Sequence, residues 1–122
     1  MFRVFRSEWY EEKLSKLDKS EKLRVEKFEQ QLKEQPFSGK PLGYEFFREK
    51  KFDGKRLIFL VYSEHSAVFL VTVVDKKVQQ QAIDMIKAQL DKYKGLIGKS
   101  LRTLNLLNFA SKYFPYSFSN VL

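Results

Sequence analysis

Two apolar runs near the middle of the chain dominate its pattern of hydrophobic and polar positions. Residues 56–62 and 67–74 are rich in β-branched and aromatic side chains, and four polar residues, 63–66, separate them. Such runs are typical of the paired strands of a β-hairpin. Because neither run alternates with polar residues, both faces of each strand are expected to be buried. The pattern therefore predicts a hairpin at the centre of a sheet.

Shorter patterns before the hairpin predict a strand, two helices and a second strand. Residues 2–6 alternate at their start and predict the first strand, after which Ser7 can cap a helix. This helix is expected to end near Asp18, where the residues of a capping box start a second helix. The second helix must stop before Pro36, which disfavours helical geometry in the preceding residue. Residues 44–50 are aromatic and partly alternating, which predicts the strand that precedes the hairpin.

The remaining patterns complete an α+β prediction. Residues 36–43 carry two prolines and two glycines and predict a turn, and Asp53-Gly54 is a tight-turn signal. After the hairpin, apolar residues at helical spacing predict a third helix over 78–93, with Gly95 as its cap. The predicted fold is a four-stranded antiparallel sheet packed on an N-terminal helix hairpin, followed by a C-terminal helix or helices.

The length of 122 residues is typical of one domain, which is predicted to span residues 1–95. Residues 96–122 differ in composition: they are basic and apolar, and they contain no acidic residue. A helix is predicted after Ser100, and residues 114–118 are expected to be irregular. The apolar face of this extension needs a partner, and three stay open: the exposed side of its own sheet, a second copy of the chain in a homodimer, or a membrane surface.

The excess of positive charge lies in the sheet and in the segment after it. The formal net charge is +8; residues 7–34 hold seven basic and eight acidic side chains, whereas residues 35–122 hold fourteen basic and seven acidic ones. This balance favours a polyanionic partner such as nucleic acid, an anionic membrane or an acidic protein. No apolar run reaches membrane-spanning length and the first residues lack the apolar core of a signal peptide, so a cytoplasmic protein is expected.

No metal or other cofactor is expected. The chain has no cysteine, which excludes disulfides and thiolate zinc sites, and it shows neither metal-ligand spacing nor a phosphate-binding glycine loop. The single histidine, His65, falls in the predicted hairpin turn and is expected to be an exposed turn residue. Any chemistry is therefore expected to depend on cations.

Four short segments share one family pattern: Gly39-Lys40-Pro41-Leu42, Arg48-Glu49-Lys50, Gly54-Lys55-Arg56-Leu57-Ile58-Phe59, and Asp75-Lys76-Lys77 with Gln79-Gln80. Together they resemble the RelE/ParE toxin superfamily, especially its archaeal RelE-like members, over about residues 2–94. Arg56 matches the family's arginine after the glycine turn, and Lys76 matches the basic residue at the end of its last strand. Many members have a tyrosine shortly afterwards, where this chain has residues 79–82, Gln-Gln-Gln-Ala.

The resemblance implies the toxin of a type II toxin–antitoxin system, a ribosome-dependent mRNA endonuclease that inhibits translation. Its implied partners are a cognate antitoxin, the ribosome and mRNA. The implied catalytic residues are Arg56, Lys76 and Lys50, and the implied RNA-binding residues are Arg48, Lys51, Lys55 and Lys77. Two alternatives stay open: a ParE-like inhibitor of DNA gyrase, and a non-catalytic RNA- or protein-binding module.

The chemistry of RNA cleavage sets requirements for these cations. Attack by the RNA's own 2′-hydroxyl needs a proton acceptor, stabilisation of charge on the phosphoryl oxygens and a proton donor for the leaving oxygen. Arg56 and Lys76 are expected to hold phosphate at the rim of the sheet. Lys50 or Lys51 would add positive charge, and would transfer protons if the pKa of the lysine is depressed.

Overall fold

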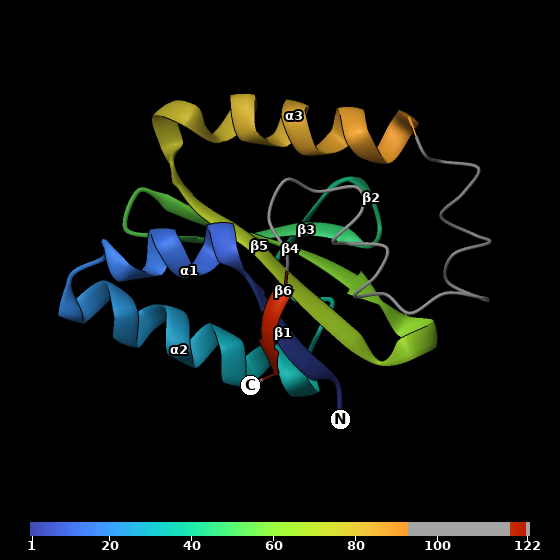
Figure 1. Ribbon diagram of the computed structural model, residues 1–122, viewed down its shortest axis with the longest axis horizontal. Coiled ribbons are helices and arrows are strands. Elements are labelled where there is room, and N and C mark those ends of the chain that lie inside the picture. Colours follow the sequence, from blue (N-terminus) through green and yellow to red (C-terminus); the bar gives the residue numbers. More distant parts are fainter. Residues whose placement is uncertain (93–117, 122) are drawn as a thin grey trace.

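The computed structural model describes residues 1–92 and 118–121, which form one mixed β-sheet with helices on both faces (Figure 1). In chain order the helices and strands are β1 (Arg3–Ser7), α1 (Glu8–Ser15), α2 (Lys19–Glu34), β2 (Lys40–Tyr44), β3 (Phe47–Phe52), β4 (Lys55–Tyr62), β5 (Ala67–Asp75), α3 (Gln79–Lys92) and β6 (Phe118–Val121). Two 3₁₀ turns, η1 (Ser63–His65) and η2 (Lys76–Val78), precede β5 and α3. The strands lie in the order β2-β3-β4-β5-β1-β6. The predicted α+β class is therefore confirmed.

The predicted apolar hairpin is the pair β4 and β5 at the centre of the sheet. The two strands pair from Lys55 opposite Asp75 to Tyr62 opposite Ala67, with one irregularity between Ile58 and Phe59. All side chains from position 56 to 62 and from 67 to 74 are buried. This burial on both faces confirms what the continuous apolar runs predicted.

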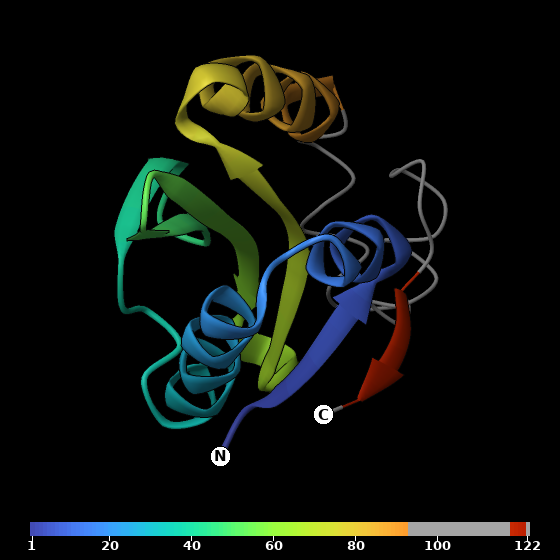
Figure 2. The same ribbon diagram turned by 90° about the vertical axis from the view of Figure 1, so that its left-hand side faces the viewer.

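Successive residues of β4 enter two different cores. Leu57, Phe59 and Val61 pack on the side of the sheet that α1 and α2 cover, with Tyr10, Val25 and Leu32 among their neighbours. Ile58, Leu60 and Tyr62 pack on the other side, with Ile83, Ile86 and Leu90 of α3. Figure 2 shows α3 and α2 on opposite sides of the sheet. We call these two sides the α2 face and the α3 face.

The sheet has six strands among the described residues rather than the predicted four, and it is not wholly antiparallel. β1 runs parallel to β5, with Arg3 opposite Ala67 and Arg6 opposite Leu70. The chain leaves β1 through α1 and α2, so no tight turn fixes the direction in which β1 pairs. The first helix is also shorter than predicted and ends at Ser15.

The predicted turn over residues 36–43 contains the edge strand β2. Lys40 lies opposite Glu49 and Pro41 lies opposite Arg48. Proline cannot donate a backbone hydrogen bond, but an edge strand tolerates it because one side of that strand is unpaired. The prediction that one strand spans 44–50 is therefore wrong in its bounds, since β2 ends at Tyr44 and β3 continues to Phe52.

The last described residues form β6, which pairs antiparallel with β1 and places Val121 opposite Phe5. The sequence predicted a largely helical extension over 96–122, so the strand corrects the end of that prediction. The predicted helix after Ser100 and the predicted cap at Gly95 lie outside the described residues. Among the residues that the structure describes, no helix combines the length and the apolar character that crossing a membrane requires.

The helix starts follow the sequence signals. The Ser7 hydroxyl accepts a hydrogen bond from the Tyr10 amide at 2.9 Å and donates one to the Val71 carbonyl at 2.6 Å. Asp18 and Glu21 form the complete predicted capping box of α2. Each cap satisfies an amide that the helix itself leaves free.

A buried ion pair joins β1 and both N-terminal helices. Glu29 is four residues before Lys33, a spacing typical of exposed helix pairs, yet it is only 2% exposed. Its carboxylate accepts two hydrogen bonds of 3.0 Å from Arg6 and one of 2.6 Å from the Tyr10 hydroxyl. Burial and the negative charge of Glu29 raise the pKa of Tyr10. The Tyr10 phenol therefore stays neutral and donates its proton to the network.

Replacing Glu29 with Ala should lower the free energy of unfolding by about 2–4 kcal/mol, because the Tyr10 hydroxyl and the Arg6 guanidinium lose their shared acceptor. Urea denaturation followed by circular dichroism measures the change. Glu12→Ala is the control, since Glu12 pairs with Lys16 at the exposed surface and its loss should cost less than about 1 kcal/mol. Equal losses in the two variants would contradict the role of the network.

Two glycines with positive φ allow a matched comparison. A Cβ on Gly39 (φ +86°) would lie 2.2 Å from the Glu49 carbonyl oxygen, whereas a Cβ on Gly54 (φ +75°) would meet nothing within 4 Å. Gly54→Ala should therefore cost about 1–2 kcal/mol from backbone strain alone. Gly39→Ala should cost about 2–5 kcal/mol, because it adds a backbone clash. Thermal unfolding of both variants tests this, and a Gly54 variant as unstable as the Gly39 variant would refute the steric account.

Candidate functional site

The alternation of β3 divides the predicted basic residues between the two faces of the sheet. Arg48 and Lys50 lie opposite Phe59 and Leu57, which belong to the α2 face. Lys51 lies opposite Arg56, and Arg56 in turn lies opposite Val74 of the α3 face. The sheet therefore brings Lys51 and Arg56 together and separates them from Arg48 and Lys50.

Arg48 stabilises the loop before β2. It is 6% exposed, and its guanidinium donates to three backbone carbonyls: that of Ser38 at 3.3 Å, that of Gly39 at 3.0 Å and that of Glu45 at 3.0 Å. It also lies 5.7 Å from the centre of the Phe37 ring. With its donors used in this way, Arg48 is occupied by contacts within the fold.

Lys50 packs against α2. Its ammonium donates to the Gln31 side chain and, at 3.1 Å, to the Ser38 hydroxyl, and it lies 4.8 Å from the centre of the Phe28 ring. Burial lowers the pKa of Lys50. The lysine with a depressed pKa therefore lies on the α2 face, whereas Arg56 lies on the α3 face.

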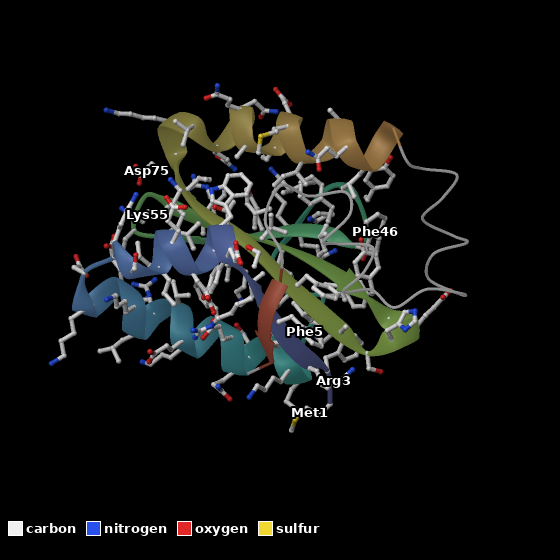
Figure 3. The ribbon with its side chains drawn as sticks, viewed as in Figure 1. Met1, Arg3, Phe5, Phe46, Lys55 and Asp75 are labelled. Carbon is white, nitrogen blue, oxygen red and sulfur yellow. The ribbon has the colours of Figure 1, made fainter. Side chains whose placement is uncertain are left out.

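Lys55 is held by two carboxylates. Its ammonium is 3.1 Å from Glu21 and 3.1 Å from Asp75, and hydrogen bonds to these groups raise the pKa of Lys55. Figure 3 shows Lys55 and Asp75 next to each other at the end of the hairpin. The charge of Lys55 is therefore largely balanced locally.

Arg56 lies under the surface of the α3 face rather than at an exposed rim. It is 7% exposed, and its Nη1 donates to the Lys55 carbonyl at 3.0 Å. Its Nε is buried, and among the described residues no acceptor bonds it. A buried donor without an acceptor typically costs about 1–3 kcal/mol, so this guanidinium can gain from an anionic ligand.

Glu49 is a buried acidic group beside Arg56 that the sequence analysis did not select. It lies opposite Ile58 on the α3 face and is 1% exposed. The pair Lys51–Arg56 lies two residues further along the same two strands. Gln79, in the first turn of α3, donates to it through Nε2 at 2.5 Å. Glu49 stands two residues before Lys51, and residues two apart in a strand share a face. This spacing in the sequence could have placed Glu49 on the same face as Lys51.

Three further lysines of the predicted site are exposed, one of them opposite Arg56. Lys51 is exposed beside Arg56, and Lys76 and Lys77 are exposed in η2. An open hollow of about 570 Å³ is lined by Gly54, Asp75, Lys76 and Lys77. The Lys76 amide donates to the Gly54 carbonyl at 2.9 Å, which fixes η2 against the β3–β4 turn.

His65 lies in η1, at the end of the β4–β5 hairpin away from Arg56. Within residues 1–92 and 118–121, no group of three or more histidine, aspartate or glutamate side chains could hold a metal ion. Among the described residues, the α3 face carries the guanidinium of Arg56, the carboxylate of Glu49 and the exposed ammonium group of Lys51. Such a set can bind phosphate and accept a proton.

Comparison with known proteins gives matches among solved structures. No protein-family model and no curated protein matches the chain. The intact E. coli RelBE toxin–antitoxin complex matches at 22% identity and a TM-score of 0.57, over 62% of this chain and 96% of that chain. An E. coli RelE double mutant bound to an antitoxin RelBc peptide matches at 22% identity and a TM-score of 0.57, over 66% and 93%. The isolated E. coli RelE toxin matches at 22% identity and 0.56, over 70% and 99%.

These matches confirm the predicted resemblance at the level of the fold, although they do not support the archaeal subgroup. They cover almost the full length of RelE, so the similarity extends over a whole toxin domain and not over one motif. The described part of the chain is therefore an α+β protein with a RelE-like fold.

Proposed function

We propose that this chain is the toxin of a toxin–antitoxin pair and that it cleaves mRNA on the ribosome. The observation that carries the proposal is the buried guanidinium of Arg56, whose Nε has no acceptor among the described residues and which lies beside Glu49 and Lys51. The RelE-like fold supports the toxin class. The net charge of +8 supports an RNA partner.

In the proposed reaction, Arg56 binds the scissile phosphate through its planar fork. The 2′-oxygen of the RNA attacks phosphorus, the bond from phosphorus to the 5′-oxygen breaks, and a 2′,3′-cyclic phosphate and a 5′-hydroxyl form. Glu49 accepts the proton of the 2′-hydroxyl, and Lys51 or a water molecule that it orients returns a proton to the leaving oxygen. Arg56 and Lys76 stabilise the charge that develops on the phosphoryl oxygens.

The remaining predicted cations take other roles in the proposal. Lys77 lies with Lys76 at the open hollow and would contact RNA phosphates outside the reacting bond. Lys50, Arg48 and Lys55 hold the fold through the contacts described above, so the proposal no longer uses Lys50 as a catalytic group. RNA binding by Arg48 and Lys55 is likewise dropped.

The proposed partners are an antitoxin, the ribosome and mRNA, all in the cytoplasm. The matched complexes contain E. coli RelE with its antitoxin RelB or a peptide of it, which supports an antitoxin for this chain. An acidic segment would complement the excess of basic residues after position 35. Homodimer formation through residues 96–122 stays a prediction from the sequence.

Expression of the chain in bacteria, with primer extension on a reporter mRNA, separates this function from its rivals. Breaks within translated codons are the expected result. Gyrase-dependent DNA damage without RNA breaks would indicate a ParE-like toxin, and unhindered growth at full soluble expression would indicate a non-catalytic module. Either of these two results overturns the proposal.

Arg56→Ala should reduce cleavage about 100-fold or more, the loss typical of a removed group that stabilises developing charge. Arg56→Lys should retain part of the activity, because an ammonium keeps the charge but not the fork. Since Arg56 is buried, thermal unfolding must accompany each assay. Lys27→Ala removes a cation from the exposed surface of α2 and should leave cleavage unchanged. Equal activity of the Arg56 and Lys27 variants, at matched soluble levels, would rule out a special role for Arg56.

Neighbouring lysines on opposite faces supply a second test. Lys51→Ala should lower the rate of cleavage about 100-fold, because it removes the group that returns a proton to the leaving oxygen. Lys50→Met should keep the rate, because Lys50 faces α2 and its long side chain packs on Phe28. Cleavage kinetics with purified ribosomes distinguish the two variants. A larger loss for Lys50→Met would place the chemistry on the α2 face.

A further inference from the structure

The site on the α3 face is closed by the first turn of α3. Glu49 and Arg56 are 1% and 7% exposed, so no phosphate can reach both groups in this conformation. Gln79 is half-buried above them, and its side-chain amide supplies the 2.5 Å hydrogen bond to Glu49. Within the described residues, no cation lies within 4.0 Å of the Glu49 carboxylate, which leaves Gln79 as the polar side chain that satisfies it.

The start of α3 follows η2, which the Lys76 bond to Gly54 holds, but its first three positions bury no apolar side chain. Positions 79–81 are three glutamines, and the first buried residue of the helix is Ala82. Ile83, Ile86 and Leu90 anchor the helix on the sheet from there on, at 8%, 1% and 1% exposure. Gln80 bonds Asp84 of its own helix, at 2.8 Å. Opening limited to positions 79–81 would therefore expose little apolar surface, which is typical of segments that open locally.

We propose that Gln79 is a latch that keeps the Arg56–Glu49 site closed in the free chain, and that a phosphodiester of single-stranded RNA binds when the latch opens. This inference rests on the proposed function, since it assigns the RNA to the same site. In the closed state Gln79 bonds Glu49, and the Arg56 Nε has no acceptor among residues 1–92 and 118–121. In the open state a phosphate oxygen accepts from Arg56, and Glu49 becomes accessible to the 2′-hydroxyl.

The closed state has a measurable consequence for affinity. When only a fraction of the molecules is open, the apparent dissociation constant for RNA is the intrinsic one divided by that fraction. A change that removes the Gln79 bond raises the open fraction and should tighten RNA binding. Loss of an ordinary contact to RNA would weaken binding instead, so the direction of the change distinguishes the two roles.

The test uses the full chain and a short single-stranded RNA whose 2′-positions are methylated, so that no cleavage occurs. Nuclear magnetic resonance follows the Arg56 Nε–H signal and hydrogen exchange in the first turn of α3. In Gln79→Ala and Gln79→Asn, hydrogen exchange in the first turn of α3 should become about fivefold faster or more. The dissociation constant for RNA should fall by a similar factor. The Arg56 Nε–H signal should shift when RNA binds. Asn keeps the amide but is one methylene too short to reach Glu49.

Gln80→Ala is the matched control, because Gln80 is the next residue, is exposed and bonds Asp84 of its own helix. It should match wild type in exchange and in RNA affinity. Unchanged exchange in both Gln79 variants, unchanged or weaker RNA binding, or no shift of the Arg56 signal in any of the variants would overturn the latch. None of these measurements needs a ribosome, so a chain that opens and binds RNA but cuts no message would refute the proposed function and leave the latch standing.

Discussion

The structure depends on one constraint, the burial of both faces of the β4–β5 hairpin. Because this hairpin has no solvated side, α1 and α2 must cover one face of the sheet and α3 must cover the other. Every residue of the neighbouring strand β3 is then assigned to one of two environments by its register with β4. A shift of β3 by a single residue would exchange Lys50 with Lys51, and Arg48 with Glu49, between the two faces.

The division of polar groups between the faces follows their hydrogen bonding. On the α2 side, Arg48, Lys50 and Glu29 have partners from loops, helices or strand β1, so their burial contributes to stability. On the α3 side, Arg56 keeps a buried donor without an acceptor among the described residues, and Glu49 has its bond from Gln79. Incomplete pairing of buried polar groups is costly, and such groups concentrate at sites that bind or react.

The sequence predicted the elements that local pattern determines. The apolar hairpin, the Ser7 cap, the capping box at Asp18 and the third helix are all local signals, and the structure confirms them. It did not predict the parallel pair of β1 with β5 or the strand β6, because these pairings join segments far apart in the chain. It also missed β2, since two prolines and two glycines in residues 36–43 resembled an ordinary turn.

The sequence could not show which of the basic residues lie together in the folded protein. Composition located the basic residues, but a cluster along the sequence does not show which of its members share a face. Arg56 stands at the start of an apolar run, so the sequence suggested an exposed rim, whereas the structure buries this residue. Glu49 is flanked by basic residues in the sequence, and this hid its buried position on the sheet.

The central claim is that the α3 face, and not the α2 face, receives the RNA. Cryo-electron microscopy of the chain on a ribosome carrying a 2′-O-methylated mRNA tests this most directly. An mRNA phosphate should be in hydrogen-bond contact with Arg56, next to Lys51 and Glu49, and the first turn of α3 should have moved away. An mRNA phosphate bound at Lys50 on the α2 face, with Gln79 still bonded to Glu49, would contradict it.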